Sequence, residues 1–149
     1  MSWYELLYQE YEYEFQEGYY QFMTHHIDFP WCFGEGLSQN KHLTWSLILE
    51  NSQKPWNWSL LSQRDDLHWS LVKHHPELPW DWKILSGHQS VTWEIVSTQL
   101  DKPWDWEELS RNQNITWDQV CNNCKHPWNW RGLSQNPNIT WEIVKDNLE

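Results

Sequence analysis

The sequence predicts an all-α fold, an α-solenoid of about five short helix-turn-helix repeats behind an N-terminal helical cap. The main observation is that tryptophan recurs in steps of 24 residues. Three series keep this step: Trp45, Trp69, Trp93, Trp117 and Trp141; Trp56, Trp80, Trp104 and Trp128; and Trp58, Trp82, Trp106 and Trp130. A fixed period of this length is typical of repeat arrays in which each unit buries its apolar face on its neighbours.

Signals for two helix starts recur along the repeats, although His68 stands where the other repeats have threonine and the first repeat departs from the pattern at Cys32 and Phe33. In residues 103–126, Asp105 precedes Trp106 as the expected N-cap of a first helix, and Glu108 stands where it would close a capping box. Thr116 is the expected cap of a second helix, with Gln119 closing its box. Isolated helices shorter than about 12–15 residues rarely persist in water, so such short helices must be held by packing. The pattern divides the chain into repeats 30–54, 55–78, 79–102, 103–126 and 127–149.

The ends of the helices are also marked. Asn40, Asn112 and Asn136 follow the first helix, and we expect them to adopt the left-handed conformation that often ends a helix. A proline closes each second helix, because it cannot continue the backbone hydrogen bonding; these are Pro55, Pro79, Pro103 and Pro127. Most of the tryptophans are predicted to form the core and the contacts between repeats, while a minority stays partly exposed.

Residues 1–29 lie outside the repeat and are acidic and rich in tyrosine. They contain six of the 21 acidic residues and no lysine or arginine, whereas the whole chain has a formal net charge of −11. We interpret the segment as a helical cap on the first repeat, with an acidic recognition tail as the alternative. An acidic protein repels the phosphate backbone, which argues against nucleic-acid binding.

Targeting and membrane signals are absent from the sequence. The first residues have neither a basic nor an apolar signal region. No stretch approaches the roughly 18–20 apolar residues that a membrane span needs, so we expect no membrane association. Three cysteines, an odd number, argue against a disulfide framework and fit a reducing compartment.

No catalytic or cofactor-binding motif stands out, so we expect neither an enzyme nor a cofactor. Cys121, Cys124 and His126 resemble part of a metal site, but no second pair of ligands lies at a useful spacing. The repeat alignment predicts that Cys124 is buried and that Cys121 faces solvent. One serine position is shared by all repeats and indicates packing or a turn hydrogen bond rather than a nucleophile: Ser38, Ser62, Ser86, Ser110 and Ser134.

The strings Pro103-Trp-Asp-Trp-Glu-Glu-Leu-Ser and Asn136-Pro-Asn-Ile-Thr-Trp-Glu-Ile-Val resemble a tryptophan-rich 24-residue repeat. This repeat is encoded in many copies by giant DNA viruses of amoebae. The resemblance covers residues 30–149, although the first repeat departs from it at Cys32 and Phe33. It implies a repeat scaffold located in the host cytoplasm or the virion, and no catalytic residues.

The predicted function is therefore a scaffold for protein–protein interaction, with an unknown protein as partner. Specificity should lie at positions that vary between repeats. The first helix offers Ser59, Lys83, Glu107 and Arg131; the second offers Lys73, Ser97, Cys121 and Lys145; a third varied row is Gln63, Gly87, Arg111 and Gln135. The alternatives are carbohydrate or other small-ligand binding by exposed indoles, and a structural role in the virion.

The last repeat predicts a second kind of contact. Its second helix presents Trp141, Ile143 and Leu148 with no further Pro-Trp-Asx-Trp helix after it in the sequence. An uncovered apolar face of this kind tends to be an interaction surface. We therefore expect self-association through the C-terminal repeat, most simply as a two-fold homodimer.

Overall fold

The computed structural model describes residues 3–146, and side chains from residue 14 to residue 145 with the exception of Gln16. All secondary structure in this range is helical, which confirms the all-α prediction, and the range contains no strand. The chain divides into two compact units, Met1–Leu61 and Ser62–Glu149. Each is described by itself.

The first unit contains α1 (Trp3–His26), the short 3₁₀ helix η1 (Leu37–Gln39), α2 (Trp45–Glu50) and most of α3 (Trp58–Ser62). The last turns of α1 pack on the first repeat, where Met23 is buried in the core with Leu43 and Leu47. The Asn40 amide Nδ2 donates to the Tyr19 hydroxyl at 2.7 Å. Burial raises the pKa of that phenol above its ordinary value. α1 therefore contributes both apolar and hydrogen-bonding contacts to the first repeat.

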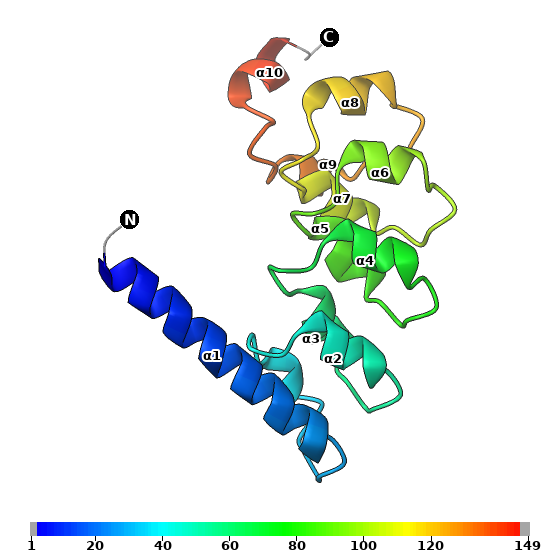
Figure 1. The fold of residues 1–149 in the computed structure, drawn as a ribbon. Coiled ribbons are helices and arrows are strands. Elements are labelled where there is room, and N and C mark those ends of the chain that lie inside the picture. Colours follow the sequence, from blue (N-terminus) through cyan, green and yellow to red (C-terminus); the bar gives the residue numbers. More distant parts are fainter. Residues whose placement is uncertain (1–2, 147–149) are drawn as a thin grey trace. The chain divides into compact units, whose positions relative to one another are not determined.

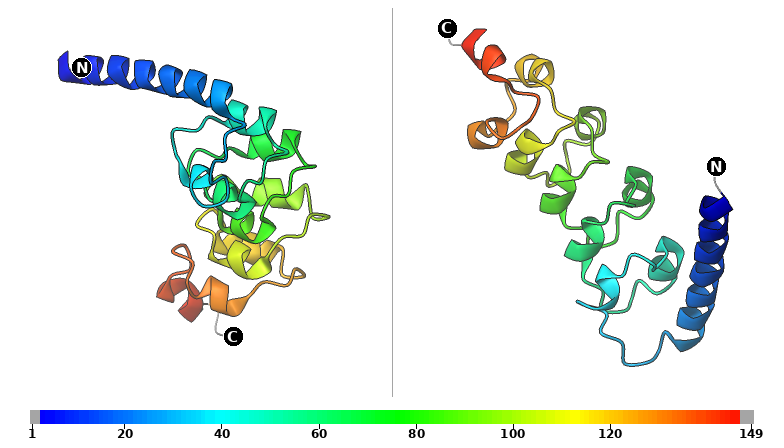
Figure 2. Two further views of the ribbon diagram at one scale, coloured as in Figure 1. Left: turned by 90° about the horizontal axis from the view of Figure 1, so that it is seen from below. Right: turned by 90° about the vertical axis from the view of Figure 1, so that its left-hand side faces the viewer.

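The second unit contains seven α-helices of the repeat region. They are α4 (Trp69–His74), α5 (Trp82–Gly87), α6 (Trp93–Ser97), α7 (Trp106–Arg111), α8 (Trp117–Asn122), α9 (Trp130–Leu133) and α10 (Trp141–Asp146). The first helices of successive repeats, α5, α7 and α9, pack on one another in order. Figures 1 and 2 show α4, α6 and α8 as a second row beside them.

Every α-helix from α2 to α10 begins at a tryptophan, directly after its cap residue. The predicted Asx caps of the first helices are confirmed: the side-chain oxygens of Asp81, Asp105 and Asn129 accept backbone N–H groups at 2.9–3.2 Å. Threonine caps of the second helices bond less well, since the hydroxyls of Thr44 and Thr140 accept at 3.4 and 3.5 Å. The Asx residues therefore give the firmer helix starts.

The capping boxes differ between the two helices of the fourth repeat. Gln119 closes the predicted box of α8, where its Oε1 accepts the Thr116 N–H at 2.9 Å. Glu108 does not close a box in α7. Its carboxylate accepts instead from Arg111 at 2.8 Å, because this arginine lies one turn ahead on the same helix.

The prediction of left-handed asparagines is wrong. No non-glycine residue in the described part of the chain has a positive φ, and Asn112 has a φ of −61°. Asn112 contributes hydrogen bonds through its side chain rather than ending the helix with a left-handed backbone conformation. The buried amide Nδ2 of Asn112 donates to the carbonyls of Ser86 and His88 at 2.9 and 3.1 Å, and its Oδ1 accepts the Asn114 N–H. Asn136 repeats the arrangement on Ser110 and Asn112.

These asparagines, with His88, form the asparagine row, which joins each repeat of the second unit to the one before. His88 replaces asparagine in the third repeat and is also buried. Its ring Nε2 lies 3.0 Å from the Arg64 carbonyl, and its Nδ1 accepts the Ser90 N–H at 3.1 Å. The imidazole therefore supplies one donated and one accepted hydrogen bond, whereas the Asn112 amide donates to both the Ser86 and His88 carbonyls and accepts one N–H.

The shared serine position forms a second row, the serine row. Its hydroxyls bond to the next repeat, a role that differs from the expected packing or turn hydrogen bond. The hydroxyls of Ser62, Ser86 and Ser110 accept the backbone N–H of the cap residue in the next repeat at 2.9–3.0 Å. Ser38 does the same for Asn57 within the first unit. These serines are buried, so each hydroxyl satisfies a backbone donor that would otherwise lack a partner.

The tryptophan of each Pro-Trp pair makes the same hydrogen bond. Its indole Nε1 donates to the backbone carbonyl five residues earlier, at 2.6–3.0 Å; the tryptophans are Trp31, Trp56, Trp80, Trp104 and Trp128. The bond closes the turn between the second helix and the next repeat, while the ring packs into the core. Buried Trp104, for example, is only 7% exposed. The predicted core role of this series is confirmed for Trp56, Trp80 and Trp104.

Candidate functional site

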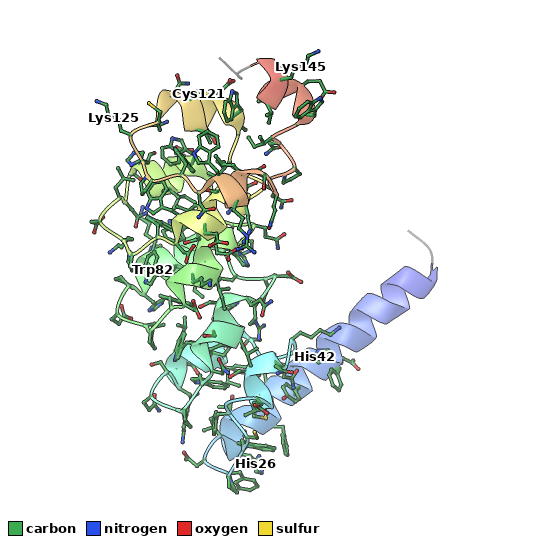
Figure 3. The ribbon with its side chains drawn as sticks, turned by 180° about the vertical axis from the view of Figure 1, so that it is seen from behind. His26, His42, Trp82, Cys121, Lys125 and Lys145 are labelled. Atoms are coloured by element: carbon green, nitrogen blue, oxygen red, sulfur yellow. The ribbon has the colours of Figure 1, made fainter. Side chains whose placement is uncertain are left out.

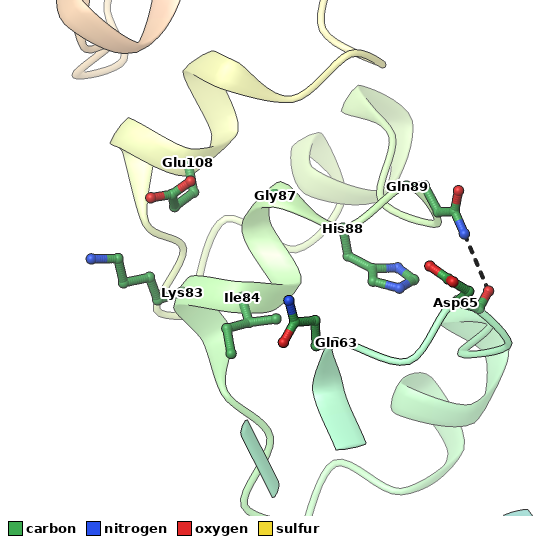
Figure 4. A pocket seen from close by; sticks show the side chains of 8 residues that line it. All are labelled: Gln63, Asp65, Lys83, Ile84, Gly87, His88, Gln89 and Glu108. Carbon is green, nitrogen blue, oxygen red and sulfur yellow. Dashed lines mark hydrogen bonds between the residues drawn. The ribbon is translucent and has the colours of Figure 1, made fainter. Parts of the chain in front are cut away.

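The second unit has two adjoining hollows on the face of α5 and α7. The first has a volume of about 450 Å³ and lies between α5 and the loop at residues 63–65. The second, of about 330 Å³, lies between residues 87–89 and residues 108–113, and Pro137 also lines it. Both hollows are lined by Gly87, Gln89 and Glu108, so they adjoin one another. We call the two hollows together the first-helix groove, and Figure 4 shows the first of them.

The groove is built largely from positions that differ between repeats. Gln63, Gly87 and Arg111 of the third varied row line it, as does Lys83 of the first-helix row. Sequence analysis missed a further row two residues along, which lines both hollows: Asp65, Gln89, Gln113 and Pro137. These residues also recur in steps of 24, and only Gln89 and Gln113 are alike among them. The same comparison between repeats, extended by two residues, would have identified them.

The first hollow is lined by opposite charges on different sides. Figure 4 shows Lys83 beside Glu108, with Asp65 and Gln89 on the opposite side of the hollow. Both Lys83 and Asp65 are exposed. The Gln89 side chain is held in place because its Nε2 donates to the Asp65 carbonyl at 3.2 Å. A bound chain would therefore meet a cation and an anion at separate points.

The second hollow carries one fixed cation. The Arg111 guanidinium donates to Glu108 Oε1 at 2.8 Å and also to the Glu107 carboxylate. Its Nε is buried with no hydrogen-bond partner among the described residues. Two carboxylates on the same helix thus hold the arginine in the wall of the groove, while one of its donors is left unsatisfied.

Gly87 marks the junction of the two hollows. The equivalent residue in the next repeat is Arg111, and a side chain at Gly87 would occupy the space that joins them. A Cβ built there would lie 3.7 Å from Glu108 Oε2, an ordinary van der Waals contact. The backbone therefore tolerates a larger residue, and its side chain would reduce the space where the two hollows adjoin.

The structure does not bring all of the predicted partner-binding residues together. The second-helix row lines neither hollow, although its members are exposed: Lys73, Ser97, Cys121 and Lys145. Figure 3 shows Cys121 and Lys145 pointing away from the ribbon. Glu107 does not line the groove, but its carboxylate accepts from Arg111, which does. Arg131 is exposed and lines neither hollow. Ser59, also exposed, belongs to the first unit.

The predicted burial of Cys124 is wrong, because Cys32, Cys121 and Cys124 are all exposed. Leu100, the equivalent of Cys124 in the preceding repeat, is also largely exposed, since α6 ends at Ser97 and this position lies in the following turn. His126 stacks on Trp106 with ring centroids 5.1 Å apart. Within the described residues, no group of three or more His, Cys, Asp or Glu side chains could hold a metal ion.

The C-terminal repeat exposes part of its predicted self-association surface. Trp141 is 68% exposed and Ile143 is half-buried, whereas Leu148 lies outside the described residues. Trp130 on α9 is also exposed. None of the helices between Trp3 and Asp146 combines the length and apolar character that crossing a membrane would take.

Comparisons with family models, with curated proteins and with solved structures give no match to this chain.

Proposed function

We propose that this protein is a non-enzymatic repeat scaffold, an α-solenoid, that binds an extended segment of a partner protein in the first-helix groove. The observation that carries the proposal is the match between the groove lining and the varied positions of the repeat. The resemblance to repeats of giant DNA viruses is the basis for expecting a host or virion protein as the partner.

Within each repeat, the positions that hold the fold together differ from those that line the groove, and this separation supports a binding role. Residues that recur in every repeat are used in caps, in the serine and asparagine rows and in the core. The side chains of the groove residues Lys83 and Gly87 make none of these contacts between repeats, whereas Gln89 bonds to Asp65 through its side chain and to Asn114 through its carbonyl. Binding sites usually occupy a rigid scaffold at positions that folding does not constrain. An extended chain could lie along the two adjoining hollows, and its own charges could pair with Lys83 and Asp65.

The experiment is a selection of random linear peptides displayed on phage against the full chain, followed by calorimetric titration of the enriched peptides. Gly87→Arg is the diagnostic variant, because it fills the junction of the hollows with the residue that the next repeat already accommodates. We expect it to weaken binding by at least about tenfold, equivalent to ~1.4 kcal/mol.

Lys73→Glu is the matched control, since Lys73 is exposed on a second helix and lines neither hollow. It should bind the selected peptides as the original chain does. The proposal is wrong if no peptide is enriched, or if enriched peptides bind the Gly87→Arg variant undiminished.

Carbohydrate binding is the second candidate, because the exposed faces of Trp130 and Trp141 could stack on sugar rings. A glycan array followed by titration of tryptophan fluorescence tests it. If no glycan is retained and none changes the indole emission, this candidate is removed.

A further inference from the structure

Two opposite charges line the first hollow without a partner in the described part of the chain. Lys83 lies on α5 and Asp65 lies in the loop at residues 63–65, on opposite sides of the hollow (Figure 4). Both side chains are exposed, and neither forms an ion pair or a side-chain hydrogen bond with another described residue. Both charges are therefore available to a ligand.

The charged side chains beside these two are paired within the fold. Arg64 donates from Nε and Nη2 to the carboxylate of Asp66, at 2.9 and 2.8 Å. Arg111 donates to Glu108 at 2.8 Å, so the carboxylate that lies beside Lys83 already has a cation of its own. Lys83 and the neighbour of Arg64, Asp65, thus differ from the charged residues around them.

The backbone that carries the two free charges is held in place. The Asp65 carbonyl accepts from Gln89 Nε2 at 3.2 Å, and the Arg64 carbonyl lies 3.0 Å from Nε2 of buried His88. Both contacts join the loop at residues 63–65 to the residues directly after α5, the helix that carries Lys83. The order of cation and anion along the hollow is therefore set by the fold.

This combination of charges is confined to one position in the second unit. The equivalent pairs of the next two repeats each lack an opposite charge: Glu107 with Gln89, and Arg131 with Gln113. A segment bound along the groove would therefore meet a free cation and a free anion at one place only.

The second hollow offers no free charge. Its charged lining residues, Glu108 and Arg111, are paired with each other, and exposed Gln113 and Pro137 add uncharged surface. The groove is therefore charged in its first hollow and electrically compensated in its second.

We propose, on the basis of the proposed function, that the first-helix groove recognises a segment of the partner protein that carries one acidic and one basic residue in a fixed order. The acidic residue pairs with Lys83 and the basic residue with Asp65, while uncharged residues of the segment lie over the second hollow. A segment with its two charges exchanged would bring like charges together at both points. Such complementarity selects partners more than it adds affinity.

The test starts from the peptides that phage selection enriches against the full chain and that the Gly87→Arg variant binds more weakly. We expect these peptides to share an acidic and a basic residue at a constant spacing and in a constant order. Lys83→Gln and Asp65→Asn should each lower the affinity measured by calorimetry roughly two- to fivefold, because one exposed ion pair contributes little.

An exchange of the two charges gives a sharper measurement. The double variant Lys83→Glu with Asp65→Lys should bind the original peptide at least about tenfold more weakly, because two repulsions replace two attractions. The peptide with its own acidic and basic residues exchanged should recover that binding. Both substitutions fall on exposed side chains, and circular dichroism checks that the double variant keeps its helices.

The matched control is Lys73→Glu with Asp118→Lys. These two residues are exposed on second helices and line neither hollow, so the same change of charges is made away from the groove. The control should keep the affinity and the peptide preference of the original chain.

The outcomes separate this inference from the proposed function. Groove-binding peptides that lack the shared pair of charges, or that bind the double variant undiminished, would overturn the charge order and leave the groove as a binding site. An exchanged peptide that recovers no binding would do the same. If selection enriches no peptide, or none that Gly87→Arg weakens, the proposed function is wrong and the charge order is wrong with it.

Discussion

Replacement of Asn112 by alanine tests whether the asparagine row joins the repeats. The side chain is 2% exposed, its Nδ2 donates to the Ser86 and His88 carbonyls, and its Oδ1 accepts the Asn114 N–H. Each hydrogen bond of this kind contributes about 1 kcal/mol net, so Asn112→Ala should cost about 3 kcal/mol, with more if the carbonyls stay unsatisfied.

Two further variants separate hydrogen bonding from packing at this position. Asn112→Asp keeps the shape and the acceptor but turns a carboxylate oxygen toward backbone carbonyls, so it should destabilise at least as much as alanine. Asn112→His should destabilise less than alanine, because His88 fulfils the role one repeat earlier. Asn122→Ala, on the exposed side of α8, is the control.

Urea unfolding followed by tryptophan fluorescence and circular dichroism measures the effect as a shift in the midpoint. If the midpoint of Asn112→Ala stays within the equivalent of about 0.5 kcal/mol of the original chain, the side chain does not join the repeats and the reasoning fails. Equal midpoints for Asn112→Asp and the original chain would also refute it, since they would mean that the buried carbonyls require no donor.

Two further pairs of variants test the packing between repeats through their thermal midpoints. Ser110→Ala removes the buried acceptor of a backbone N–H and should cost about 1–3 kcal/mol, whereas Ser134→Ala, at the exposed end of the row, should be nearly neutral. Equal effects of the two would show that the hydroxyl does not act through the next repeat. Gly132→Ala should destabilise by about 1–3 kcal/mol, because its Cβ would lie 2.6 Å from the Glu107 carbonyl oxygen. Gly18→Ala meets nothing within 4 Å in α1 and should stabilise; a stable Gly132→Ala would mean that α9 can move away from α7.

The helix starts could be predicted from the sequence because they depend on local chemistry. An Asx residue before tryptophan caps a helix whatever surrounds it, and Asp81, Asp105 and Asn129 do so. The role of the asparagine row could not be predicted in this way. Asn112 and Asn136 bond to carbonyls 21–26 residues away in sequence, and nothing local distinguishes that use from a left-handed helix end.

The candidate groove could be predicted in part. Variation between repeats identified Gln63, Lys83, Gly87 and Arg111, because positions that folding leaves free are those that change. It could not separate the groove from the equally variable second helices, where Lys73 and Cys121 lie exposed on another row. That distinction depends on which helices pack closely enough to form a hollow, and only the structure provides it.

The contacts between repeats explain why so much of the sequence is fixed. Helices α4–α10 have four to six residues each, too short to persist without tertiary support. The serine row, the asparagine row and the indole contacts supply that support, and each joins one repeat to another rather than closing within a repeat. A repeat is therefore complete only when the next one covers it.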